Sequence, residues 1–213
     1  MLRFDDPQGS PGWHKARIGH VTASGLDNIL TPKALQASKA SEKYLHQLVA
    51  EHALGRSLDE AESVYMERGL VMEGEAAAWY EMEKDTETEI VGFLLTDDER
   101  LGCSPDRLVG ADGGLEIKCP GAIAHVGYFL DPTTLVAEYR GQVQGCLAVT
   151  GRKWWDLLSY NPEIPSVLVR VLPDPAYQAA LARELPAFHA RLAAAKEKVG
   201  AMLETARDAN PFL

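Results

Sequence analysis

Two acids and a lysine lie close together in the stretch "SPDRLVGADGGLEIKCP", which spans residues 104–120. Asp106 precedes a glycine-rich turn, and Glu116 and Lys118 follow that turn within an apolar run. Two strands joined at "GADGG" would bring both carboxylates together, because a hairpin places its strands side by side. The alternation of side chains along "LEIKCP" puts Glu116 and Lys118 on the same face of the second strand. The pattern therefore predicts a cluster of two acids and one ammonium group.

Two neighbouring carboxylates repel each other unless a cation lies between them. Oxygen ligands without His or Cys favour Mg²⁺, for which Mn²⁺ can substitute, over zinc. Lys118 would then orient or deprotonate a water, or neutralise charge on a pentavalent phosphorus. Hydrolysis of a phosphodiester uses all of these parts. The simpler alternative is a solvated pair of Glu116 and Lys118 on an edge hairpin, worth at most about 1 kcal/mol.

The hydrophobic pattern predicts the elements that would hold this cluster. Helices are expected at residues 22–30, 41–55, 62–85, 134–151 and in the tail from 174, where Pro186 permits a break. Short apolar segments predict a meander of strands at 89–98, 100–110 and 114–120, followed by strands at 153–161 and 166–172. This order predicts an α/β (α+β) fold, with a central mixed β-sheet flanked by helices.

Composition narrows the class of protein. With 213 residues, 46% of them hydrophobic, we expect a single domain over residues 1–213 that needs no disulfide or metal to fold. The formal charge of −10 disfavours a protein that coats nucleic acid through its overall charge, although a local cationic groove could still hold DNA. Three cysteines without CxxC spacing, no signal peptide and no membrane-spanning segment predict a soluble, cytoplasmic protein. The histidines show no zinc-binding spacing, so we assign them no ligand role.

Four stretches in a fixed order carry a family resemblance. They are "WHKARIGHVTAS" (13–24), "ERGLVMEGEAAAWY" (67–80), "CSPDRLVGADGGLEIKCP" (103–120) and "YRGQVQGCLAVTGRKWWDLLSYNP" (139–162). Together they resemble the lambda-type phage exonucleases, the YqaJ-like recombination branch of the PD-(D/E)xK nuclease superfamily. The resemblance covers most of the chain and implies a restriction-endonuclease-like core in a protein that a phage or prophage encodes and that acts in the cytoplasm of its bacterial host.

The resemblance also implies a reaction and partners. Asp106 and Glu116, with the backbone carbonyl of Ile117, would bind the metal ions, and Lys118 would be the catalytic lysine. The implied enzyme is a Mg²⁺-dependent 5′-to-3′ exonuclease that digests one strand of linear double-stranded DNA and leaves a 3′ single-stranded tail. The resemblance further implies a homotrimeric ring around DNA, which would reconcile an acidic chain with a polyanionic substrate, and a single-strand annealing protein as partner.

Further site residues follow from the same resemblance. Glu73, in the G-x-x-x-E pattern that begins at Gly69, would approach the metals from a helix, directly or through water. Glu75 lies two residues on and would point elsewhere, as a solvated acid. Gln142 would be the glutamine nearest the metals, hydrogen-bonded to the attacking water or to a carboxylate, whereas Gln144 could equally serve the site or satisfy internal polar groups.

A phosphate site is expected upstream of this cluster. In the family the "RxGxxTAS" segment holds the terminal 5′-phosphate, which here indicates Arg17 and Ser24. A guanidinium beside a helix N-terminus is a good phosphate site on physical grounds as well, although Arg17 could be an ordinary surface cation. Met66 lies where relatives carry an apolar residue that separates the terminal base pair. Three tryptophans could stack on bases or belong to the core, namely Trp13, Trp154 and Trp155, and the core is favoured for the last two.

Two rival functions remain open at this stage. One is a structure-specific or site-specific endonuclease of the same superfamily, against which the 5′-phosphate segment argues. The other is a non-catalytic adaptor that binds DNA ends in recombination. An adaptor needs none of Asp106, Glu116 and Lys118, so their presence together argues against it.

Overall fold

The computed structural model describes residues 1–58 and 64–209, and the side chains of residues 64–71, 207 and 209 lie outside the described part. The helices are α1 (Pro11–Arg17), the 3₁₀ helix η1 (Ala23–Asn28), α2 (Ser41–Leu54), α3 (Val64–Lys84), α4 (Ala122–Leu130), α5 (Pro132–Glu138), α6 (Arg140–Thr150) and α7 (Pro175–Ala209). The strands are β1 (Leu2–Phe4), β2 (Thr88–Glu89), β3 (Phe93–Leu95), β4 (Gly102–Cys103), β5 (Arg107–Val109), β6 (Gly113–Lys118), β7 (Trp154–Asn161) and β8 (Ile164–Val171).

The strands form two sheets. The larger one is mixed, in the order β2-β5-β6-β7-β8, with β6 and β7 parallel and the other pairs antiparallel. The chain passes from β6 to β7 through α4, α5 and α6, because parallel neighbours need a long crossover. The smaller sheet has the order β1-β3-β4. The expected mixed sheet with flanking helices is confirmed, but the single meander is wrong, since β3 pairs with the N-terminal strand β1 and with β4, and the three form a separate sheet from β5 and β6.

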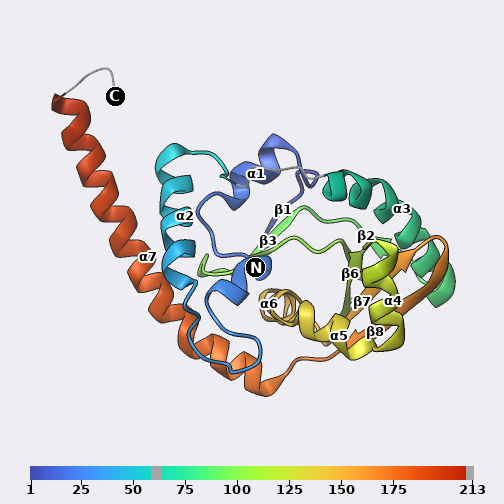
Figure 1. Ribbon diagram of the computed structural model, residues 1–213. Helices are drawn as coiled ribbons and strands as arrows, with labels where there is room; N and C mark the ends of the chain where they lie inside the picture. Colours follow the sequence, from blue (N-terminus) through green and yellow to red (C-terminus); the bar gives the residue numbers. More distant parts are fainter. Residues whose placement is uncertain (59–63, 210–213) are drawn as a thin grey trace.

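The two faces of the larger sheet carry different helices (Figure 1). Leu115 and Ile117 of β6 pack toward α3, where Ala76 and Tyr80 are also buried. The opposite face packs against α5 and α6. Alternation along β6 therefore turns Glu116 and the apolar residues to opposite faces, as predicted. The hairpin between β5 and β6 is also confirmed by its antiparallel register.

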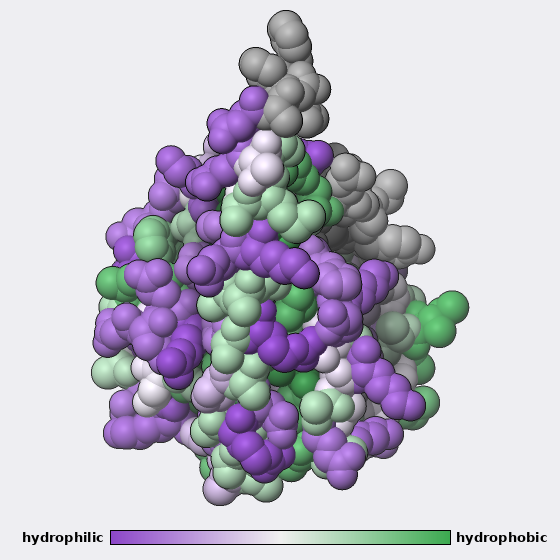
Figure 2. Space-filling model, turned by 90° about the vertical axis from the view of Figure 1, so that its left-hand side faces the viewer, coloured by the Kyte–Doolittle hydropathy of each residue, from purple (hydrophilic) through white to green (hydrophobic). Residues whose placement is uncertain are grey.

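A third layer of helices covers the other side of α6 and bears on the site. α6 packs closely on η1: a side chain at Gly145 would collide with Ala23 and Leu26. α2 packs against the long helix α7, whose C-terminal end runs past the rest of the fold (Figure 1). Hydrophilic side chains cover most of the face on which this layer lies, with apolar ones scattered between them (Figure 2). Among the described helices none is both long and apolar enough to cross a membrane.

One helical prediction is wrong, one helix was not predicted, and the alternative left open at Pro186 is decided. The predicted helix at 134–151 is two helices that meet at Tyr139, and Gly151 ends the second one in a left-handed conformation with φ 64°. α7 continues through Pro186, because its buried face, which includes Tyr177 and Phe188, holds the helix against the core. α4 was missed because its nine residues are almost uniformly apolar, so they show no helical alternation.

One strand begins earlier than expected. β8 starts at Ile164 and includes Pro165, although a proline lacks the N–H group that a central strand needs. β8 lies at the edge of the sheet and pairs only with β7 among the described strands. An edge strand can accept a proline on its unpaired side. The sequence pattern predicts that the strand begins at residue 166, one residue after Pro165.

Candidate active site

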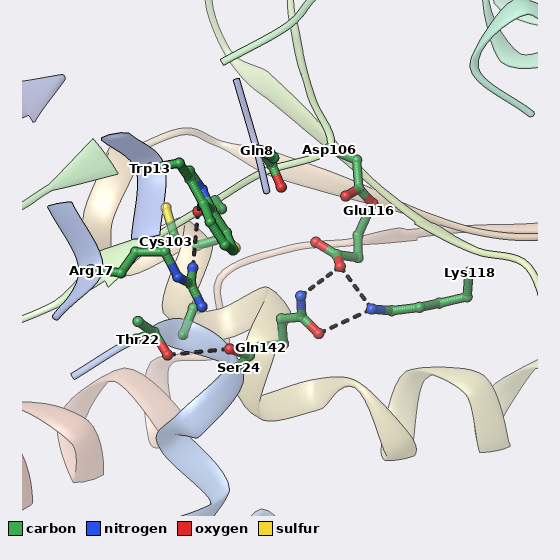
Figure 3. A pocket seen from close by; sticks show the side chains of 13 residues that line it. Gln8, Trp13, Arg17, Thr22, Ser24, Cys103, Asp106, Glu116, Lys118 and Gln142 are labelled. Atoms are coloured by element: carbon green, nitrogen blue, oxygen red, sulfur yellow. Dashed lines mark hydrogen bonds and ion pairs between the residues drawn. The ribbon is translucent and has the colours of Figure 1, made fainter. Parts of the chain in front are cut away.

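A pocket of about 220 Å³ lies where β6, α6, α1 and η1 meet (Figure 3). Its wall contains most of the residues singled out in the sequence. The lining residues are Gln8, Trp13, Arg17, Thr22, Ala23, Ser24, Cys103, Ser104, Asp106, Glu116, Lys118, Gln142 and Cys146. The two predicted groups, the acid–lysine cluster and the phosphate segment, therefore share one pocket.

Asp106 lies directly before β5 and faces β6 across the hairpin. Its Oδ2 accepts a hydrogen bond of 2.6 Å from the backbone N–H of Ile117. This bond fixes the carboxylate beside the strand that carries Glu116. Burial raises the pKa of Asp106 well above its ordinary value, and the charge of Glu116 raises it further, while Lys118 and the Ile117 N–H act in the opposite direction. The fold therefore holds an acid where its negative charge is poorly compensated.

Glu116 has one satisfied and one unsatisfied carboxylate oxygen. Its Oε1 accepts hydrogen bonds from Lys118 Nζ at 2.8 Å and from Gln142 Nε2 at 2.5 Å. Its Oε2 is buried and has no hydrogen-bond partner in the described structure. A buried carboxylate oxygen without a partner is costly, so such an atom calls for a ligand. A cation held by both Asp106 and Glu116 would satisfy it and remove their mutual repulsion.

The donor set fits a hard divalent cation. The two carboxylates face the same pocket and no histidine lines it, so oxygen ligands suited to Mg²⁺ or Mn²⁺ dominate. Within the described residues, no group of three or more His, Cys, Asp or Glu side chains is arranged to hold a metal. Further ligands would have to be waters, substrate oxygens or backbone carbonyls, and the carbonyl of Ile117 stays a prediction in that role.

Glu73 does not line the pocket. It lies on α3, and its Oε1 accepts a hydrogen bond of 2.8 Å from Arg107 Nη1 in an ion pair. Its charge still raises the pKa of Asp106. The structure thus places Glu73 near the acidic pair, with its carboxylate engaged by Arg107. Its predicted approach to the metals would require that ion pair to loosen.

Lys118 is held as a cation between two acids and an aromatic ring. Burial lowers the pKa of Lys118, but the charges of Glu116 and Asp106 outweigh this effect and keep the pKa above its ordinary value. Lys118 Nζ also donates a hydrogen bond of 3.2 Å to Gln142 Oε1 and lies 4.5 Å from the centroid of the Tyr139 ring. Gln142 therefore bridges Glu116 and Lys118, as a residue at the centre of the cluster.

The opposite wall of the pocket is cationic. Arg17 Nη1 donates a hydrogen bond of 3.0 Å to Ser104 Oγ, and its guanidinium lies 4.1 Å from the centroid of the Trp13 ring. Trp13 Nε1 donates to the same Ser104 oxygen at 2.9 Å. At the start of η1, the hydroxyls of Thr22 and Ser24 are hydrogen-bonded at 3.2 Å. A guanidinium, two hydroxyls and a helix N-terminus can together bind an anion.

Other candidates lie elsewhere. Gln144 faces away from the pocket, donates to the backbone oxygen of Leu172 and accepts from the backbone N–H of Asp174. Trp155 is fully buried in the core, as favoured, and Trp154 packs under the guanidinium of Arg170 at 3.6 Å.

Two further predictions concern α3. The Glu75 carboxylate accepts a hydrogen bond of 2.8 Å from Tyr160 Oη, so it is not simply solvated. The side chain of Met66 lies outside the described residues.

Ser104 and Gln8, which line the pocket, and Tyr139, which contacts Lys118, were not predicted as site residues. Ser104 stands two positions before Asp106 within the quoted motif, but a lone serine gives no signal of its own. Tyr139 could have been noticed as the first residue of the "YRGQVQ" stretch. Gln8 lies far upstream, and only the tertiary structure shows that the N-terminal segment reaches the pocket.

Comparison with known proteins places this geometry among nucleases. A family model described as a YqaJ-like viral recombinase domain matches residues 12–153. An alkaline exonuclease from Laribacter hongkongensis, solved alone and in complex with dAMP, is 31% identical, with a TM-score of 0.81 over 92% of this chain and 100% of its own. A phage-related exonuclease from Haemophilus somnus 129PT is 12% identical, with a TM-score of 0.61 over 94% of this chain and 97% of its own, which shows a shared fold. No curated protein matches the chain.

Proposed function

The chain belongs to the YqaJ-like viral recombinase family, and from this premise we propose that it is a Mg²⁺-dependent 5′-to-3′ exonuclease. It is a deoxyribonuclease with the fold of the lambda-type phage exonucleases. The proposal adds that it digests one strand of linear double-stranded DNA and leaves a 3′ tail for recombination by strand annealing. The observation that carries the proposal is the buried, unpartnered Oε2 of Glu116, which faces the same pocket as Asp106 and Lys118.

The acid–lysine cluster suits hydrolysis of a phosphodiester. Asp106 and Glu116 would hold the cation, which when bound polarises the phosphodiester and makes water a better nucleophile. Lys118 is fixed by Glu116 and Gln142, so its ammonium can neutralise the charge that develops on the phosphoryl oxygens. Because these groups are already oriented by hydrogen bonds, little reorganisation is needed when the substrate binds.

The cationic wall would set the polarity of digestion. Arg17, with Ser24, would bind the 5′-terminal phosphate, and the scissile phosphodiester would then lie at the acidic wall of the same pocket. A single pocket that contains both walls would hold the 5′ end of a strand and the scissile phosphodiester together. This arrangement supports removal of terminal nucleotides, and the dAMP found with the Laribacter hongkongensis relative is a mononucleotide of the kind that such an enzyme would release.

The two rival functions predict different behaviour. An endonuclease would nick closed circular plasmid promptly in the presence of Mg²⁺, whereas the proposed enzyme would leave it intact. An adaptor would bind ends in EDTA and release no nucleotides when Mg²⁺ is restored. The buried acid–lysine cluster supports the enzyme, because such a cluster costs stability and an end-binding protein has no use for it.

Three parts of the proposal rest on the family resemblance more than on the site itself. We propose that the protein forms a homotrimer, acts with a single-strand annealing protein and works in the cytoplasm of a bacterial host. The formal charge of −10 supports the assembly, since cationic groups would have to be concentrated on an inner surface to hold DNA. Light scattering with size-exclusion chromatography would give three times the 23.3 kDa chain mass.

Digestion of end-labelled linear duplex over time tests the proposal as a whole. Substrates with a 5′-phosphate and a 5′-hydroxyl are compared with and without Mg²⁺. We expect mononucleotides to be released from the 5′ end only with Mg²⁺, and faster from the phosphorylated end. Release from the 3′ end, or equal release in EDTA, would contradict the proposal.

A further inference from the structure

The N-terminal segment brings a glutamine to the edge of the catalytic pocket. β1 pairs with β3, and Pro7 to Ser10 form a turn closed by the bond from Ser10 N to Pro7 O at 3.0 Å. Gly9 in this turn has φ 82°, a conformation that suits glycine. A side chain at Gly92 would collide with the backbone of Phe4, so the segment passes in direct backbone contact. Gln8 is therefore delivered to the pocket by a rigid path that begins before the matched residues 12–153.

Two backbone carbonyls fix the orientation of the Gln8 amide. Its Nε2 donates to Val91 O at 3.1 Å and to Pro105 O at 2.8 Å. Carbonyl oxygens only accept hydrogen bonds, so the nitrogen must face them and Oε1 must face the other way. Figure 3 shows this oxygen directed into the pocket, on the side where the carboxylates of Asp106 and Glu116 lie. Among the described residues none donates a hydrogen bond to it.

Two other neutral side-chain oxygens among the described lining residues on this side of the pocket are already engaged. Gln142 Oε1 accepts from Lys118, and Ser104 Oγ already accepts from both Trp13 and Arg17. The carboxylates would be engaged by the cation. A water that attacks phosphorus, or one that a cation retains, has two protons and needs acceptors for them. The Oε1 of Gln8 is a neutral acceptor at the right place.

We propose that Gln8 is a further site residue that acts through both ends of its amide. Its oxygen accepts a hydrogen bond from a water beside Asp106 and Glu116, and its nitrogen holds the backbone carbonyl directly before Asp106. This inference rests on the proposed function and extends it with a residue that the sequence did not indicate. Groups that orient metal-bound ligands through hydrogen bonds typically contribute 10-fold to 100-fold in metal affinity or activity.

A pair of glutamine variants separates this role from simple anchoring. Gln8→Met removes both ends of the amide while keeping its length. Gln178→Met is the matched control. The Nε2 of Gln178 also donates two hydrogen bonds, to the backbone and side-chain oxygens of Gln144, and Gln178 does not line the pocket. We expect both variants to lose similar stability. Only Gln8→Met should also lose about 10-fold or more in kcat with a KM for DNA ends within about twofold, and about 10-fold or more in Mn²⁺ affinity by calorimetry.

A second variant tests the donor end of the amide. Gln8→Glu keeps the length of the side chain but sets a second oxygen against the carbonyls of Val91 and Pro105, so kcat should fall as it does in Gln8→Met. The inference is overturned if Gln8→Met keeps wild-type kcat and Mn²⁺ affinity, or if Gln8→Glu keeps wild-type kcat. If the wild type and Gln8→Met release nucleotides at the same rate, this inference fails and the proposed function stands. A wild-type protein that neither binds Mn²⁺ nor digests DNA removes the proposed function with it.

Discussion

The side-chain amide of Gln142 donates a hydrogen bond of 2.5 Å to Glu116. The bond comes from α6 and reaches across to β6, so it ties the helix to the catalytic strand. The same amide accepts from Lys118, which means that one glutamine sets the positions of both an acid and its cation. This relationship makes the positions of the site groups depend on how α6 packs.

Substitution of Gln142 should therefore affect mainly kcat, whereas substitution of Gln144 on the same helix should affect mainly the free energy of unfolding. Gln142→Leu should lower kcat by about 10-fold or more with a smaller loss of stability, because Glu116 Oε1 keeps its hydrogen bond from Lys118. Gln144→Leu should lower the free energy of unfolding by about 1 kcal/mol or more and leave kcat near the wild-type value, because the part-buried backbone oxygen of Leu172 and N–H of Asp174 lose their side-chain partner. Urea denaturation and single-turnover digestion check both. Equal kinetic losses in the two variants would contradict the assignment.

Loss of the lysine should abolish catalysis and leave the fold intact. In Lys118→Ala the ammonium disappears, so charge on the phosphoryl group is no longer neutralised and the rate should fall by about 10³-fold or more. Circular dichroism should be unchanged, and binding of DNA ends in Ca²⁺ should persist. Lys153 is an exposed control, since Lys153→Ala removes a lysine that pairs with Asp112 and does not line the pocket. Full activity in Lys118→Ala would overturn its role.

The phosphate site predicts a loss of discrimination. Arg17→Ala should remove the preference for 5′-phosphorylated over 5′-hydroxyl ends, because the guanidinium is the strongest phosphate donor on that wall. Lys15→Ala, on the exposed side of the same helix, should keep the preference. The measurement is the ratio of initial digestion rates on the two substrates. An unchanged ratio in Arg17→Ala would place the phosphate site elsewhere.

The raised pKa of Asp106 indicates that its charged form lowers the stability of the metal-free protein, although that form is needed to bind the metal. Because folding raises this pKa, the charged form destabilises the metal-free protein at neutral pH, so Asp106→Asn should be at least as stable as the wild type without metal. As pH falls through the raised pKa, Asp106 becomes protonated in the wild type. The difference in stability between the wild type and Asp106→Asn should therefore shrink. Thermal unfolding from pH 7 to pH 5 in EDTA checks the sign. With Mn²⁺ only the wild type should gain stability.

The site could be predicted from the sequence more accurately than the fold. Asp106, Glu116 and Lys118 could be placed together because a hairpin and the alternation of a strand are local rules, and both hold here. The separation of β3 and β4 into another sheet could not be predicted, since it depends on pairing with β1 some 90 residues away. Gln8 was missed for the same reason, and α4 was missed because its exposed apolar residues, such as Ile123 and Leu130, show no alternation.

Glu73 shows where a residue's role cannot be inferred from the family resemblance alone. The pattern that begins at Gly69 identified the residue, but only side-chain packing reveals its ion pair with Arg107. Since Arg107 and Asp106 are adjacent, a change at the acidic pair could release Glu73 toward the pocket. Spacing along the chain cannot show which of two partners a carboxylate chooses.

Anomalous diffraction from crystals soaked in Mn²⁺ with a 5′-phosphorylated oligonucleotide tests the central claim most directly. A peak about 2.1 Å from a carboxylate oxygen of both Asp106 and Glu116, with Lys118 beside it, is the predicted result. An empty space between these two acids at saturating Mn²⁺, with the oligonucleotide bound, would contradict the account.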